Sequence, residues 1–110
     1  MREAILSSVR SRPITTFQDL TVDVPGFRGN LGMFTPLHDS IIIWHACSTE
    51  AIAALGGLIG ERAVRMQPAP NISYKQTGDL PPVPVCRDVN DLGSDTPVIR
   101  WFPVVFTEPE

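Results

Sequence analysis

The chain has 110 residues, of which 43% are hydrophobic and 19% are charged, and its net charge is −3. This balance predicts one globular domain, since disordered chains hold fewer apolar residues and carry more net charge. The charge argues against a general nucleic-acid-binding domain, because phosphate neutralisation usually requires a clear basic excess.

The chain also lacks the sequence features of a membrane or secreted protein. No apolar run approaches the roughly 20 residues needed to cross a bilayer. The first residues lack the long apolar region of a signal peptide. We therefore expect a cytoplasmic location without a membrane partner, where Cys47 and Cys86 are reduced thiols.

Two short helices are predicted near the start of the chain. Apolar residues of Glu3–Ser11 fall on one helical face, and the arginines lie outside it. Thr15 or Thr16 can cap a second helix over Phe17–Leu20 by accepting a hydrogen bond from a free amide.

The remainder of the chain predicts one central helix among strands. Ile41–Trp44 is β-branched and apolar on both faces, which is typical of a covered strand. The clearest helix is Glu50–Gly60, capped by Ser48 or Thr49. Further strands are predicted at Ala63–Gln67, Ile72–Gln76, Leu80–Val85 and Val98–Phe106, with prolines marking edges or bulges. This order predicts an α+β fold with a small antiparallel sheet.

The opening helix, break and helix, with Thr16 and Leu20 in a T-x-x-[DE]-L pattern, resemble a winged helix-turn-helix domain. The resemblance implies a recognition helix in the DNA major groove and a β-hairpin wing on the backbone. Here that helix would lie within Val24–Phe34, and the wing would be Ile72–Val85. The chain is also similar, in its size and lack of motifs, to small accessory proteins of mobile gene cassettes and phages.

Residues 1–34 hold four arginines against three acidic residues, so their net charge is +1 while the remainder carries −4. Any contact with double-stranded DNA is therefore expected at this end. Arginine can recognise guanine and asparagine adenine. The expected DNA-contacting residues are Arg2, Arg10, Arg12, Phe27, Arg28, Asn30 and Lys75. The first functional hypothesis is a non-catalytic DNA-binding accessory regulator.

The apolar C-terminal segment supports a second hypothesis. Alternation gives Trp101–Phe106 two apolar faces, and covering both is demanding in a chain of 110 residues. We therefore expect a homodimer or another protein partner, as in an antitoxin-like or phage accessory assembly module. The expected interface residues are Trp101, Phe102, Val104 and Phe106.

A third hypothesis is a small cysteine enzyme or a small-molecule binder around Trp44. Cys47 precedes a predicted helix, whose amide end lowers a thiol pKa, and His45 or His38 could act as the base. No third group completes a catalytic motif, so we expect no enzyme and no cofactor. We also expect no metal site. The possible zinc ligands do not have the spacing of a zinc site; they are His38, His45, Cys47 and Cys86. The acidic residues of the following loop do not have the spacing of a calcium site; they are Asp88, Asp91 and Asp95.

Overall fold

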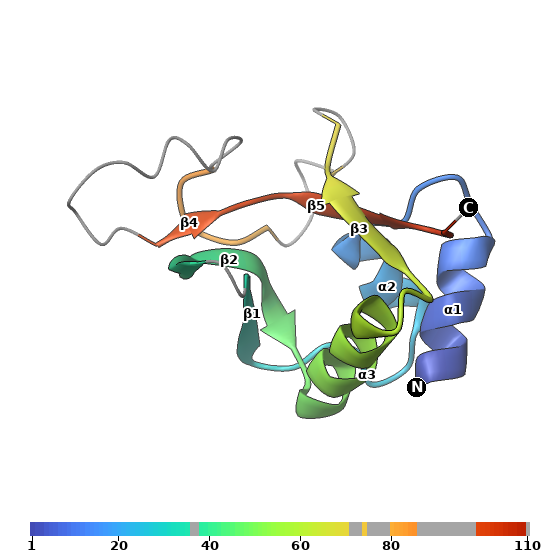
Figure 1. The fold of residues 1–110 in the computed structure, drawn as a ribbon. Helices are drawn as coiled ribbons and strands as arrows, with labels where there is room; N and C mark the ends of the chain where they lie inside the picture. Colours follow the sequence, from blue (N-terminus) through green and yellow to red (C-terminus); the bar gives the residue numbers. More distant parts are fainter. Residues whose placement is uncertain (36–37, 71–73, 75–79, 86–98, 110) are drawn as a thin grey trace.

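The computed structural model of the protein describes residues 1–35, 38–70, 74, 80–85 and 99–109 (Figure 1). Within these ranges the chain forms three helices and two small sheets, which confirms the predicted α+β class. The helices are α1 (Arg2–Arg10), α2 (Phe17–Asp23) and α3 (Thr49–Gly60). The strands are β1 (Leu31–Thr35), β2 (His38–Cys47), β3 (Arg65–Pro68), β4 (Arg100–Trp101) and β5 (Val104–Thr107).

Local capping positions the second and third helices as predicted. The Thr16 hydroxyl accepts a hydrogen bond from the Asp19 amide at 3.1 Å, and the Asp19 carboxylate accepts one from the Thr16 amide at 3.0 Å. This reciprocal capping box begins α2, which continues to Asp23, past the predicted end at Leu20. The Ser48 hydroxyl caps α3 by accepting from the Ala51 amide at 3.1 Å.

The sheets differ from the antiparallel arrangement that the sequence predicted. One sheet has the order β1-β2-β4, in which β1 is antiparallel and β4 parallel to β2. The parallel pair is possible because the connection from β2 to β4 contains α3, and such crossovers let strands run in one direction. The second sheet is the antiparallel pair of β3 and β5.

The last predicted strand is divided between these two sheets. Trp101 in β4 pairs with Ile42, whereas Val104 in β5 pairs with Pro68. Pro103 lies at the break, where its missing N–H cannot support a continuous ladder. Of the predicted hairpin arms, 80–85 forms only an isolated bridge from Val85 to Trp101, and 72–76 lies outside the described residues except for Tyr74.

The predicted recognition helix within Val24–Phe34 is wrong, because this segment forms a loop followed by β1. Gly26 has a φ of +78°, in the left-handed region that favours glycine. Gly29 packs directly on the end of β2, where an added Cβ would overlap the Cys47 carbonyl oxygen and lie 2.6 Å from the Ser48 Cα. The loop is therefore shaped by close contact with a distant strand.

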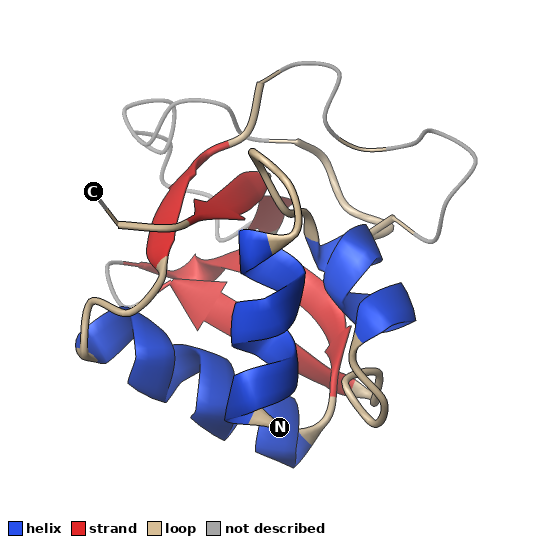
Figure 2. Cartoon of the chain, turned by 90° about the vertical axis from the view of Figure 1, so that its right-hand side faces the viewer, coloured by secondary structure: helices blue, strands red, loops and turns tan. Residues whose placement is uncertain are grey.

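An aromatic cluster joins the helices to both sheets. Phe17 stacks on Trp44 with ring centroids 5.3 Å apart and meets Phe106 edge-on at 5.0 Å. The Tyr74 hydroxyl donates a hydrogen bond to the Val104 carbonyl at 2.7 Å and accepts one from the Phe17 amide at 3.1 Å. Figure 2 shows the three helices together in front of the strands. The ring contacts link the two sides, because Phe17 belongs to α2, Trp44 to β2 and Phe106 to β5.

Candidate interaction surface

Two of the arginines expected at DNA phosphates form ion pairs with carboxylates of this chain. Arg2 donates to both oxygens of Glu61, at 2.6 and 2.7 Å, and both side chains are exposed. Gly57 leaves room for this contact, since an added Cβ would lie 3.1 Å from the Arg2 guanidinium. Arg10 lies 3.8 Å from Glu108. These pairs lower the net positive potential that the arginines present to a phosphate.

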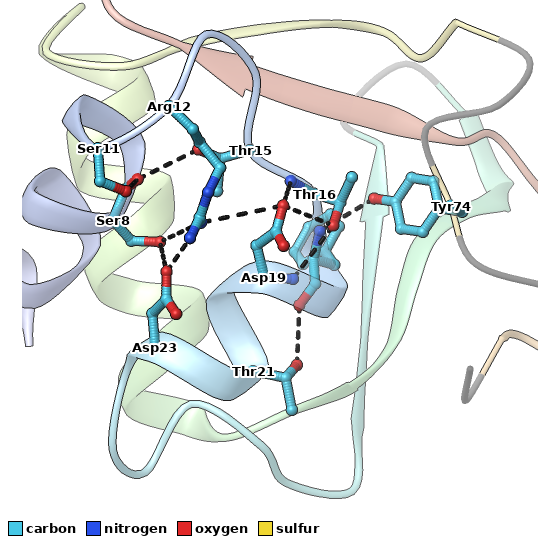
Figure 3. Close-up of polar contacts among 10 residues, drawn as sticks. Ser8, Ser11, Arg12, Thr15, Thr16, Asp19, Thr21, Asp23 and Tyr74 are labelled. Atoms are coloured by element: carbon cyan, nitrogen blue, oxygen red, sulfur yellow. Dashed lines mark hydrogen bonds and ion pairs between the residues drawn. The ribbon is translucent and has the colours of Figure 1, made fainter. Parts of the chain in front are cut away.

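Arg12 belongs to a polar network between α1 and α2 (Figure 3). Its guanidinium donates to the Asp23 carboxylate at 2.8 Å, and the Ser8 hydroxyl donates to the same oxygen at 2.7 Å. The Ser8 hydrogen bond, followed by that of Arg12, lowers the pKa of Asp23 below its usual value. Arg12 also lies 3.9 Å from Asp19. The network holds two helices together, which gives Arg12 a structural role.

The remaining expected DNA contacts fall into three environments. Phe27 is completely buried, with its ring centroid 6.1 Å from that of Phe17, so its prediction as a base-contacting residue is wrong. The ring is buried because the loop before β1 folds onto the aromatic cluster. Arg28 and Asn30 are exposed on this loop. Lys75 lies outside the described residues.

The C-terminal segment is core, which corrects the prediction that it is an exposed interface. Trp101, Val104 and Phe106 are at most 4% exposed, and Phe102 is partly buried. β5 is covered because it lies between β3 and Thr15, whose amide and carbonyl exchange hydrogen bonds with Phe106 at 2.9 and 2.8 Å. No short-range signal in the sequence indicates this bridge between residues 15 and 106.

Cys47 is buried and is not an activated thiol, contrary to the third hypothesis. Burial raises the pKa of Cys47 to about 12, so the thiol stays protonated at neutral pH. Its neighbour Ser48 makes the helix cap. The His45 ring packs edge-on against Trp44 at 4.8 Å, and the side chain of His38 lies outside the described part.

Neither a metal site nor a membrane-spanning helix is found among the described residues. No group of three or more His, Cys, Asp or Glu side chains among them is placed to hold a metal ion. In the same residues, no helix has the length and apolar character required to span a bilayer.

Two of the exposed large apolar side chains of the described residues lie on β1, at the edge of its sheet. Leu31 is 42% exposed and Phe34 is 44% exposed. β1 ends the order of its sheet, and among the described strands it pairs only with β2. No charged residue occurs from Gly29 to Thr35, although charges commonly protect natural sheet edges from pairing. In the described part of the chain, no strand pairs with this outer edge, and the pairing of β1 with β2 is itself irregular, with register shifts between Leu31 and Thr35.

Gly32 shapes the surface of this edge strand. An added Cβ there would lie 3.1 Å from the Phe34 ring and 3.0 Å from Ile42, so the absent side chain lets the ring lie along the strand. The sequence analysis missed the site because the resemblance to a winged helix-turn-helix domain placed a recognition helix within 24–34. The available signals were the glycines and the strand-favouring Phe34 and Thr35.

Comparison with known proteins finds no matching family model, no matching curated protein and no matching solved structure. The function is therefore inferred from the geometry of the described residues.

Proposed function

We propose that the protein is a non-catalytic interaction domain that pairs the open edge of β1 with a β-strand of a partner chain. The observation that carries this proposal is an uncharged edge strand with two half-exposed apolar side chains, Leu31 and Phe34. Strand addition supplies backbone hydrogen bonds to such an edge, and the side chains supply apolar contact.

The first partner to test is a second copy of the same chain. In an antiparallel pair centred on Met33, Gly32 of each copy would lie opposite Phe34 of the other, and Leu31 opposite Thr35. The Phe34 ring of each copy already lies over Gly32 of its own strand, so the two rings would be diagonal neighbours on one face of the pair, within reach of an aromatic contact. The twofold arrangement repeats each contact, and it brings no like charges together within the strand.

The expected association is weak. Complete burial of a half-exposed leucine or phenylalanine contributes on the order of 1 kcal/mol. A five-residue strand is also smaller than a standard protein interface. Dissociation constants in the micromolar range or weaker are therefore expected.

Light scattering over a concentration series tests the proposal with two matched variants. Phe34→Lys adds a charge to the β1 edge, whereas Val22→Lys adds one on α2, where Val22 is 83% exposed. We expect the wild type and Val22→Lys to associate at high concentration and Phe34→Lys to stay monomeric. A wild type that is monomeric at every concentration, or association unaffected by Phe34→Lys, contradicts the homodimer.

A nuclear magnetic resonance titration tests strand addition at β1 separately from dimerisation. The added strand is a synthetic peptide that has the sequence of 29–35. Shifts centred on β1 in the wild type, absent from Phe34→Lys, support strand addition even if the protein does not dimerise. If light scattering shows no association and the peptide causes no shift at β1, the proposed function is wrong.

DNA binding by the exposed Arg28 and Asn30 is a second candidate, although the loop that holds them is not a recognition helix. It has less support because 24–34 forms no helix and three arginines pair with carboxylates of this chain. Titration of generic duplex DNA at several salt concentrations tests it. Binding that weakens steeply with salt and is reduced by Arg28→Glu supports this function, whereas absence of binding at low salt removes it.

A further inference from the structure

We draw no further inference here: the strongest candidate, the open outer face of α3 around Ala53, Gly56 and Gly60, carries none because nothing in the described part of the structure shows what covers it.

Discussion

The strands β5 and β1 are both short and free of charged residues, yet the chain buries the first and leaves the second half exposed. Phe106 in β5 is completely buried between β3 and the bridge from Thr15, whereas Phe34 in β1 is 44% exposed. Composition therefore does not decide which apolar strand is available to a partner. The decisive factor is what the chain places on each side of the strand.

The largest expected difference between the two strands concerns the free energy of unfolding. Phe106→Ala removes a buried ring that contacts Phe17, so we expect a loss of about 3–5 kcal/mol. Phe34→Ala removes a half-exposed ring, and its loss should be below about 1 kcal/mol. Urea denaturation of both variants measures these values. Equal losses would contradict the contrast between a core strand and a surface strand.

The loop that begins β1 should be the next most sensitive feature. Gly29→Ala forces a Cβ against the backbone of Cys47 and Ser48, so we expect destabilisation of about 1–3 kcal/mol. Gly56→Ala is the matched control, because no atom lies within 4 Å of its added Cβ. Alanine is the better helix former, so this control should gain up to about 1 kcal/mol in a urea titration. Tolerance of Gly29→Ala would show that the close approach is not required.

Cys47, at the buried end of β2, is expected to react with an alkylating reagent mainly when the protein is unfolded. Because burial raises the pKa of Cys47 to about 12, iodoacetamide should label it far more slowly in the folded protein than in urea at neutral pH. Mass spectrometry of the Cys47 peptide measures this rate separately from Cys86. Folding favours the protonated form of the Cys47 thiol. The contribution of this thiol to the free energy of unfolding is therefore present below its unfolded pKa, near 8.5, and is lost as the pH rises from that value through the higher folded pKa. Equal labelling of folded and unfolded protein would show that Cys47 is accessible.

The smallest expected effect is the acid sensitivity of the network between α1 and α2. Ser8 and Arg12 lower the pKa of Asp23, so their contribution is present above the unfolded carboxyl pKa, near 3.9. It is lost as the pH falls through the lower folded value. Asp23→Asn should weaken this pH dependence in denaturation experiments between about pH 5 and 2.

Glu61→Gln provides the control for Asp23→Asn. Its pair with Arg2 also lowers the pKa of Glu61, but both side chains are about half exposed, and surface ion pairs contribute little to stability. An equal response of the two variants would show that the Ser8 hydrogen bond adds nothing specific.

Features set by neighbouring residues could be predicted from the sequence. The Thr16 and Asp19 capping pair specifies the start of α2, and the run after Ser48 specifies α3, because each depends on residues within one or two helical turns. The central strand around Ile41–Trp44 also follows from local β-branched and apolar character.

Features set by distant contacts could not be predicted in this way. The loop before β1 depends on the approach of Gly29 to Cys47, and the burial of β5 depends on the bridge from Thr15 to Phe106. Neither pair leaves a periodic pattern in the sequence. The candidate site was missed for the same reason, since β1 lies at the edge of its sheet because β4, from the distant C-terminal part of the chain, pairs with the other side of β2.

Hydrogen exchange of the β1 and β5 amides over a protein concentration series tests the central claim most directly. We expect the β5 amides to be protected at every concentration, because β3 and Thr15 pair with them within one chain. We expect the β1 amides to gain protection as the concentration rises, and Phe34→Lys to abolish this gain. Exchange at β1 that does not depend on concentration, or fast exchange at β5, would contradict the central claim.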